Sequence, residues 1–296
     1  MDLVIATAAQ GVLWGLYALG VYLTYRVLDI ADLTVEGSFP LGAAVAASML
    51  VAGYTPLTAI LAACAAGCVS GIVTGFFCTK LKIPALLAGI LTMIGLYSIN
   101  LRVMGKANLP LLQQETLFTE WNIWGLDAAT NILLIGTVVV VLAILLTYWF
   151  FGTELGSALR ATGNNEDMIR ALGFNVNKGK LIALMVSNGL VGLSGGLVAQ
   201  SQKYADINMG TGAIVIGLAA IVIGEVLLSK YINFAVKLTA AVFGTVVYFW
   251  IRAVVLRLGL DANYMRVVSA IIVFIALAVP VILERVRIRK SYRADV

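Results

Sequence analysis

Few residues in this chain are suited to covalent or metal chemistry. There is no histidine, which excludes imidazole catalysis, imidazole metal sites and histidine proton relays. The three cysteines, Cys64, Cys68 and Cys78, lie in one apolar stretch. The Cys64–Cys68 pair could bind a metal or be oxidised, but small buried thiols in a helix are the simpler interpretation. The sequence therefore predicts no catalytic site and no metal site.

A nucleotide site is not predicted either. Gly179-Lys180 is followed by Leu181, and no glycine precedes it at the spacing of a phosphate-binding loop. There is also no evident Ser–base pair and no Gly-x-Gly-Asp protease pair, so an intramembrane enzyme is the weakest of the functions considered. We expect no enzymatic activity and no cofactor in this chain.

Small polar residues gather in two segments, 26–42 and 203–217, each of which follows a long apolar stretch and leads into another. The run from Ala31 to Gly37 has the same outline as the run from Ala205 to Thr211. This is the arrangement expected of an inverted repeat, whose interrupted helices commonly line a transport path, although two ordinary loops would look similar.

These polar residues have a physical reason to face protein or water. An Asp in the bilayer core costs about 2.5–3.5 kcal/mol on insertion scales. The predicted wall of the path is formed by Asp32, Thr34, Glu36 and Ser38, with Asn100, Asn188 and Gln200 behind them and Asp206 and Asn208 in the second segment. Solvation in a loop is the alternative for the carboxylates, and inter-helix hydrogen bonding is the alternative for Asn100, Asn188 and Gln200.

The elements that must position these residues are membrane-spanning helices. Of the 296 residues, 61% are hydrophobic and 12% are charged. In a soluble domain about a quarter of the residues are charged. Apolar runs of about 20 residues, the length that spans a bilayer, recur throughout. We predict an all-α polytopic membrane protein, a single domain over residues 1–296, with about nine spans at 3–28, 39–55, 57–79, 83–104, 129–151, 181–202, 208–228, 232–256 and 264–283.

The distribution of basic residues predicts the orientation. With the N-terminus outside, all but six of the 20 Lys and Arg residues lie inside, and those six are Arg102, Lys106, Lys203, Arg252, Arg257 and Arg266. The positive-inside rule then favours N-out and C-in, with the basic tail over 284–290 as the strongest indication. The net charge of +5 reflects this orientation rather than a nucleic-acid partner. Trp121 and Trp124 suit the outer interface, and Arg252 is expected to extend outward to it.

Two connections are long enough to matter: an outer loop over 105–128 and an inner loop over 152–180. The inner loop contains the pattern of a short capped helix, in which Asn164 or Asn165 caps the start and a glycine ends it. Two acidic residues suit its first turn and an arginine its last. This helix exposes apolar residues that need a partner surface, and its residues are Gly163, Asn164, Asn165, Glu166, Asp167, Met168, Ile169, Arg170, Leu172 and Gly173. Packing on its own chain is the alternative to docking on another protein.

The stretch from Gly152 to Gly173 resembles the cytoplasmic coupling segment of ABC-importer permeases, in the branch that serves branched-chain amino acids, ribose-type sugars and nucleosides. The stretches 29–38, 187–196 and 210–212 resemble the same family. The resemblance implies a type II-like permease of the bacterial inner membrane. It also implies a homodimer, two cytoplasmic ATPases that bind the ATP and Mg²⁺, and one extracytoplasmic solute-binding protein.

The resemblance also bears on the substrate. The run from Leu33 to Phe39 is similar to one subgroup associated with aromatic amino acids such as tryptophan or tyrosine. Sugar permeases of this branch usually have a Gly-Ile-Asp-Leu-Ser-Val-Gly pattern there, whereas this chain has Ala31 in place of the first glycine and adds Glu36. An amino acid is therefore the favoured substrate. A nucleoside or sugar permease is one alternative, and an ion-coupled secondary transporter is another, although no span carries an acid at its centre.

Overall fold

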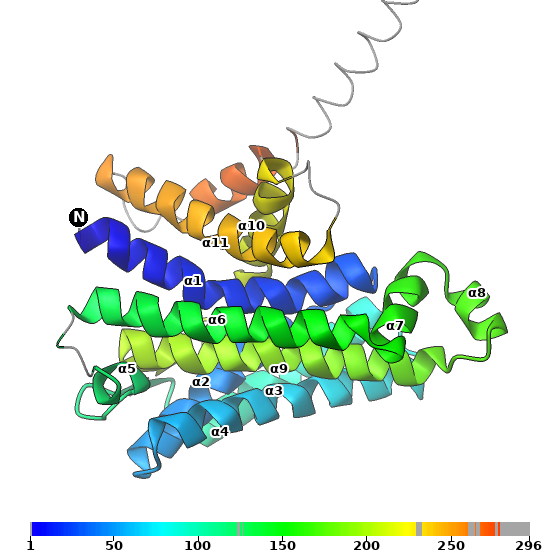
Figure 1. Cartoon of the computed structure of the whole chain (residues 1–296). Coiled ribbons are helices and arrows are strands. Elements are labelled where there is room, and N and C mark those ends of the chain that lie inside the picture. The colour runs from blue at the N-terminus through cyan, green and yellow to red at the C-terminus, as the bar shows by residue number, and fades with distance from the viewer. Residues whose placement is uncertain are drawn as a thin grey trace, which may run out of the picture.

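The computed structural model describes residues 2–122, 125, 127–228, 233–259, 264, 267–275 and 278. The apolar helices are α1 (Asp2–Tyr22, extended by the π-helical turn η1, Leu23–Val27), α2 (Val35–Val51), α3 (Pro56–Thr79), α4 (Ala85–Met104), α6 (Ala128–Gly152), α9 (Val176–Gln202), α10 (Ala213–Leu227) and α11 (Phe234–Arg257). Helices α1, α3, α4, α6 and α9 run roughly side by side, and α10 crosses their direction, as Figure 1 shows.

Six helices of the described residues are long and apolar enough to cross a membrane, namely α1 with η1, α3, α4, α6, α9 and α11. The predicted spans 39–55 and 208–228 correspond to the shorter apolar helices α2 and α10. The last predicted span, 264–283, is described as helix only over 267–275. Trp124, Lys230, Arg266 and the basic tail over 284–290 lie outside the described residues.

The predicted starts of α2 and α9 differ from the observed ones. Helix α2 begins at Val35 rather than at 39, so Pro40 lies inside the helix. Helix α9 begins at Val176 rather than at 181, because the Asn175 side chain accepts a hydrogen bond from Lys178 N at 3.1 Å and caps it there. The polar residues of that first turn made it look like part of the loop.

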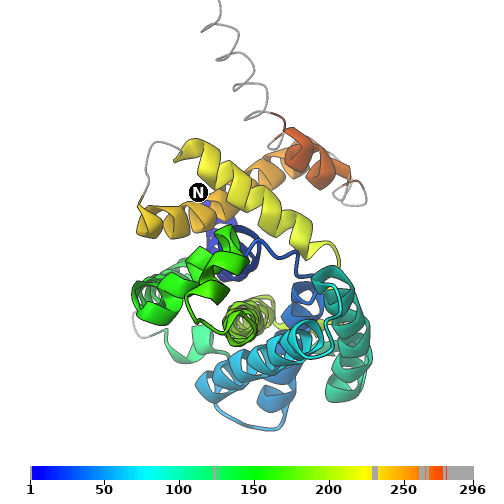
Figure 2. The same cartoon turned by 90° about the vertical axis from the view of Figure 1, so that its right-hand side faces the viewer.

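Helix α9 lies at the centre of the bundle, packed against α1, α2 and α3 (Figure 2). Glycines make these close contacts possible. A Cβ on Gly75 of α3 would lie 3.1 Å from Leu181 Cα of α9, and one on Gly11 of α1 would lie 2.7 Å from Val246 Cα of α11. The glycine-rich faces therefore pack helices within one chain.

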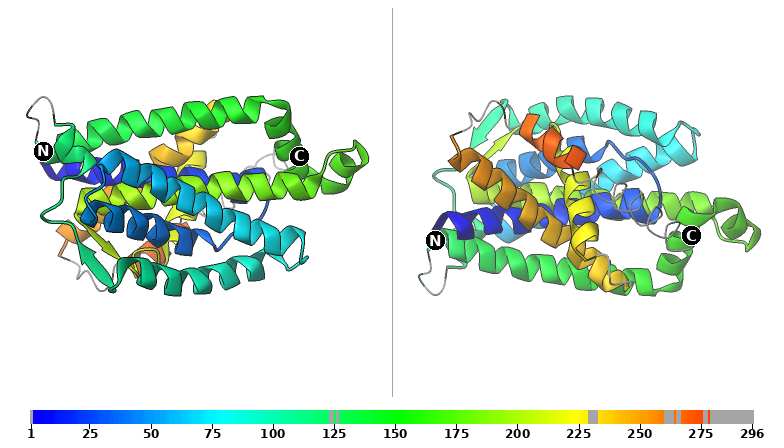
Figure 3. Two further views of the ribbon diagram at one scale, coloured as in Figure 1. Left: turned by 90° about the horizontal axis from the view of Figure 1, so that it is seen from below. Right: turned by 90° about the horizontal axis from the view of Figure 1, so that it is seen from above.

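The two ends of the bundle carry different structures. At one end lie the start of α1, a small antiparallel sheet of β1 (Asn108–Pro110) and β2 (Tyr204–Asp206), and the short helix α5 (Leu117–Glu120). At the other end lie α7 (Glu154–Asn164) and α8 (Glu166–Ala171), as both views of Figure 3 show. The N-terminal end of the chain and the predicted inner loop are therefore on opposite ends of the molecule.

Candidate functional site

A buried network of hydrogen bonds holds the first polar segment. Asp32 is 4% exposed, and its Oδ1 accepts a hydrogen bond from Thr34 N at 2.9 Å. Its Oδ2 accepts one from Asn188 Nδ2 of α9 at 2.8 Å. The Ser38 hydroxyl of α2 donates to Asn188 Oδ1 at 2.7 Å. Four predicted path residues thus contact one another, and solvation in a loop is the wrong interpretation for Asp32.

The same network continues into α3 and α4 through residues that the sequence analysis did not identify. Ser38 Oγ lies 2.7 Å from Ser70 Oγ, and Thr34 Oγ1 lies 2.7 Å from Thr74 Oγ1. Thr74 also donates to Thr92 Oγ1 at 2.9 Å. Because Ser70 and Thr74 are four residues apart on the glycine-rich face of α3, their helical spacing was a signal that could have found them.

The charge of Asp32 is stabilised only in part. Burial raises the pKa of the Asp32 carboxyl, while the hydrogen bonds from Thr34 and Asn188 oppose that rise. Asp32 lies in the connection between η1 and α2, outside the long helices. Its hydrogen bonds tie this connection to α9, so the network fixes where α2 begins.

Asn100 and Gln200 also bond between helices. Asn100 Nδ2 of α4 donates to Gly37 O of α2 at 3.2 Å. Gln200 of α9 donates to Pro56 O at the start of α3 at 3.3 Å, and its Oε1 accepts from Leu117 N at 2.8 Å. With Asn188, these residues confirm the inter-helix hydrogen bonding that the sequence analysis gave as the alternative.

The second polar segment repeats the turn of the first. Asp206 Oδ1 accepts a hydrogen bond from Asn208 N at 2.8 Å, just as Asp32 Oδ1 accepts from Thr34 N two residues on. Asp206 Oδ2 accepts from Asn108 Nδ2 at 3.2 Å, which ties the segment to β1. This sheet was not anticipated. Residues 204–206 form its strand β2 and residues 207–212 form a turn, so α10 starts at Ala213 rather than at 208.

The two segments meet at Glu36 of α2. Glu36 Oε1 accepts a hydrogen bond from Gly212 N, at the start of α10, at 3.1 Å. A Cβ on Gly210 would lie 2.7 Å from Pro40 Cδ and would also clash with the Glu36 carbonyl oxygen. Because Pro40 has no N–H to bond to that carbonyl, α2 has an irregular point here, and only a glycine fits against it.

A cavity of about 360 Å³ lies between α2, α4 and residues 207–211. Among the residues that line it are three predicted path residues, Glu36, Asn100 and Asn208. The Asn100 Oδ1 atom is buried and has no hydrogen-bond partner in the described part of the chain. Glu36 brings a carboxylate to this cavity. A carboxylate accepts hydrogen bonds, so the cavity suits a donor group such as an ammonium.

Helix α7 connects the bundle to the predicted docking helix. The Thr153 hydroxyl caps α7 by accepting from Gly156 N at 3.3 Å. Leu159 is fully buried, and a Cβ on Gly179 of α9 would lie 2.9 Å from its Cδ2. A Cβ on Gly163 would clash with Val27 O at the end of α1 and η1. Gly163 and Asn164 thus belong to α7, which packs directly on the spanning helices.

Helix α8 has the caps that the sequence predicted. Asn165 Oδ1 accepts from Met168 N at 3.0 Å at its start. At its end Gly173 takes φ 86°, Gly173 N donates to Arg170 O at 3.1 Å and Phe174 N donates to Ile169 O at 3.3 Å, which is a Schellman motif. The predicted short helix is confirmed, beginning after Asn165.

One predicted feature of α8 was wrong. Ile169 is 5% exposed rather than exposed, because it faces its own chain, while Met168 and Leu172 are 51% and 75% exposed. An ion pair between Glu166 and Lys180 of α9 holds the start of α8. Asp167 and Arg170 form a longer, exposed ion pair at 3.5 Å. The free face of α8 is therefore formed by Met168, Leu172 and a charged pair.

Another ion pair joins α1 to α10 beside this end of the bundle. Glu225 of α10 pairs with Arg26 of η1. The side chain of Arg26 is 44% exposed and that of Glu225 is 29% exposed. The Glu225 carboxylate of α10 is thus directed toward η1. The pair attaches the short helix α10 to the long helix α1.

Comparison with known proteins identifies the family. Residues 3–277 match the model of the family described as branched-chain amino acid transport system, permease component. The chain is 39% identical over 278 residues, 94% of its length, to the tyrosine transport system permease protein of Clostridioides difficile, covering 91% of that protein. No solved structure matches.

More distant relatives agree with this family. The chain is 36% identical over 282 residues to an uncharacterised protein of Rickettsia prowazekii, covering 94% of this chain and 98% of that protein. It is 28% identical over 253 residues to the ribose import permease protein of Escherichia coli, covering 84% of this chain and 76% of the relative. The chain therefore belongs to the permease family of branched-chain amino acid transport systems and is a multi-pass inner-membrane transport subunit.

Proposed function

We propose that this chain is the permease of an ABC importer that carries an aromatic amino acid. It works as a homodimer with two cytoplasmic ATPases and receives its substrate from an extracytoplasmic solute-binding protein. The observation that carries the substrate class is the similarity over 94% of the chain to a tyrosine transport system permease. The sequence from Leu33 to Phe39, which includes Glu36, supports the same substrate class.

In this proposal α8 receives the force of the ATPase. Its exposed Met168 and Leu172 insert into a groove of the partner, and Arg170 and Asp167 provide charge at the rim of the contact. A six-residue helix is too short to hold its shape alone, but here its caps and the Glu166–Lys180 ion pair hold it on α9. A displacement of α8 is therefore transmitted to the central helix.

The proposed topology has nine spans, with the N-terminus outside and the C-terminus inside. It is supported by the position of the start of α1 and of α8 on opposite ends of the bundle (Figure 1). If α8 docks on a cytoplasmic ATPase, the start of α1 and the β1–β2 sheet lie outside, next to the binding protein.

The proposed path includes the cavity at Glu36, Asn100 and Asn208. An amino acid is a zwitterion, so its path needs polar groups and few fixed charges. The Glu36 carboxylate on this cavity complements the ammonium group of the amino acid. Asp32, Thr34, Ser38 and Asn188 support the path by fixing α2 against α9. Asp206 and Gln200 do the same for the second segment and for α3.

The docking role is tested with Arg170→Glu in the assembled complex. We expect substrate-loaded binding protein to stimulate ATP hydrolysis at least tenfold less than in the wild type, because the reversed charge faces the groove of the ATPase. Insertion and thermal stability should be unchanged, since Arg170 is exposed. Lys178→Glu is the matched control: it reverses an exposed charge on the same side of the bundle but outside α8. Stimulation equal in both variants and the wild type would refute the docking role.

The second candidate function is import of a sugar, which the similarity to a ribose permease favours. ATP-dependent uptake of labelled tyrosine and of labelled ribose into proteoliposomes with the whole complex separates the two. Uptake of tyrosine that follows a proton or sodium gradient without ATP would instead identify a secondary transporter.

A further inference from the structure

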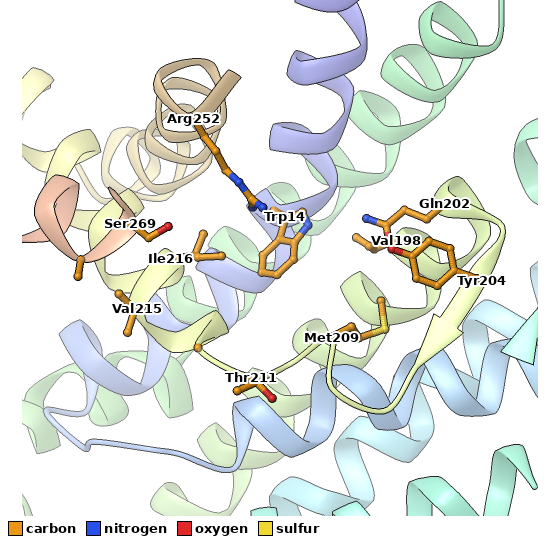
Figure 4. A pocket seen from close by; sticks show the side chains of 12 residues that line it. Trp14, Val198, Gln202, Tyr204, Met209, Thr211, Val215, Ile216, Arg252 and Ser269 are labelled. Carbon is orange, nitrogen blue, oxygen red and sulfur yellow. The ribbon is translucent and has the colours of Figure 1, made fainter. Parts of the chain in front are cut away.

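A separate cavity of about 460 Å³ opens between α1, α10, α11 and residues 202–212, as Figure 4 shows. Its volume lies within the range of about 300–1,000 Å³ of small-molecule sites. It is at the end of the bundle that carries β2, and none of the predicted path residues lines it. Thr211 lines both this cavity and the one at Glu36, so residues 207–212 separate the two.

An arginine from a spanning helix extends into this cavity. In Figure 4 the Arg252 side chain points from α11 toward Trp14, rather than outward to the membrane surface as the sequence suggested. Its guanidinium lies 5.9 Å from the ring centroid of Phe249. In the part of the chain that the structure describes, no ion pair joins Arg252 to a carboxylate. An ionisable side chain within a span that faces a cavity marks a binding site by default.

Aromatic side chains form the walls beside this arginine. Trp14 is 7% exposed, and its ring is held by Phe39 at 4.7 Å and by Phe249 at 5.7 Å between centroids. Tyr204 of β2 lines the opposite side of the cavity and is 40% exposed. A rigid ring on one side and an accessible ring on the other can take an aromatic ligand between them.

Polar groups complete the lining. Gln202 and Thr211 carry oxygen atoms that can accept hydrogen bonds, and both line the cavity together with the thioether of Met209. A guanidinium binds a carboxylate through two parallel hydrogen bonds. The cavity thus offers a cation for a carboxylate, acceptors for an ammonium and rings for an aromatic side chain.

We propose that this cavity is a substrate site within the permease, which binds an aromatic α-amino acid through its carboxylate at Arg252 and its ring at Trp14 and Tyr204. The inference rests on the proposed function. It adds that the permease itself selects for an amino acid with an aromatic side chain and a free carboxylate, after the binding protein has delivered the substrate. From this site the substrate passes residues 207–212 to reach the cavity at Glu36.

The test measures binding of labelled L-tyrosine to the complex of permease and ATPases in nanodiscs, without the binding protein. We expect L-tryptophan to compete, and tyramine, which lacks the carboxylate, and L-leucine, which lacks the ring, to compete at least tenfold more weakly. Arg252→Gln should weaken tyrosine binding at least tenfold, and Trp14→Leu should weaken it as well. Arg257→Gln is the matched control, because it removes the same charge from the same helix outside this cavity.

Three results would overturn the inference. The first is that Arg252→Gln binds tyrosine with the same affinity as the wild type. The second is that tyramine competes as well as unlabelled tyrosine does. The third is that native mass spectra show Arg252→Gln to have lost only a bound anionic lipid. The competition series needs no variant, so it decides even if a variant does not fold. If the complete complex imports tyrosine with ATP while its permease binds none, the site is refuted and the proposed function stands. If the complete complex imports no aromatic amino acid, the proposed function fails.

Discussion

At the scale of single residues, the buried side chain of Asn188 makes hydrogen bonds to three other residues. It donates to Asp32 and to Leu184 O, and it accepts from Ser38. A buried carboxylate that loses its hydrogen-bond donor pays the cost of desolvation without compensation. Asn188 therefore stabilises the charge of Asp32 and the attachment of α2 to α9 at once.

This position gives a stability prediction. Asn188→Ala should lower the free energy of unfolding by about 1–3 kcal/mol, because Asp32 Oδ2 loses the Asn188 amide that donates to it and the Ser38 hydroxyl loses one of its acceptors. The measurement is thermal unfolding of the detergent-purified permease. Asn177→Ala, on the exposed first turn of the same helix, is the control and should leave the unfolding temperature unchanged. Equal stability of the two variants would contradict the network.

The sequence identified these polar residues but not their partners. Asp32 and Asn188 stand out because polar groups among apolar spans need a reason. Their contact joins residues far apart along the chain, and nothing in the local sequence determines which helices become neighbours. Asn100 and Gln200 were placed on a path for the same reason, while both bond to backbone carbonyls of other helices.

At the scale of elements, the glycines determine how closely α3 approaches α9. Gly71 faces the backbone of α9 at Leu184 and Met185, where a Cβ would lie 2.8 Å from Met185 Cα. Gly95 in the interior of α4 faces open space. Both glycines lie in the interior of a long apolar helix, but only Gly71 contacts another helix. Comparing substitutions at the two positions therefore separates the effect of packing from that of helix propensity.

We expect opposite signs for the two alanine substitutions. Gly71→Ala should destabilise the permease by about 1–3 kcal/mol, because α3 and α9 must move apart. Gly95→Ala should stabilise it by about 0.4–1 kcal/mol, because alanine restricts the unfolded chain at a position with room for a methyl group. Unfolding temperatures measured in one detergent compare the two, and a shift in the same direction for both would contradict the close approach.

Local signals predicted the limits of α8 well, because capping decides them. Asn165 and Gly173 mark the limits of α8 because a cap acts within one turn of its own helix. The burial of Ile169 could not be predicted in this way, since it depends on where α9 runs after the turn at Gly173. Likewise, β1 pairs with β2 across nearly one hundred residues, and a three-residue strand has no periodic pattern of its own.

At the scale of the whole molecule, the two halves of the chain have corresponding contacts. α3 packs along α9 as α11 packs along α1, and α2 packs on α3 as α10 packs on α11. The Asp32 and Asp206 turns add the same backbone geometry at the same place in each half. These correspondences support the inverted repeat that the sequence suggested.

The orientation of the whole molecule gives a further prediction. In a variant with Cys64, Cys68 and Cys78 replaced by alanine, Gln113→Cys should react with a membrane-impermeant maleimide in intact cells. Asn164→Cys should react only in inside-out vesicles. Both positions are exposed. Gln113 lies between β1 and α5 and Asn164 ends α7, and these elements are at opposite ends of the bundle. Labelling of Asn164→Cys from outside would place α8 where no cytoplasmic ATPase can reach it.

The hydrogen bond from Gly212 to Glu36 has a mechanical consequence. Gly212 has no side chain to cap α10, so the first amide of that helix depends on a carboxylate from the other half of the protein. If α10 tilted away by itself, that amide would lose its acceptor. This hydrogen bond therefore couples α2 to α10, and we expect the two helices to move together when the permease changes conformation.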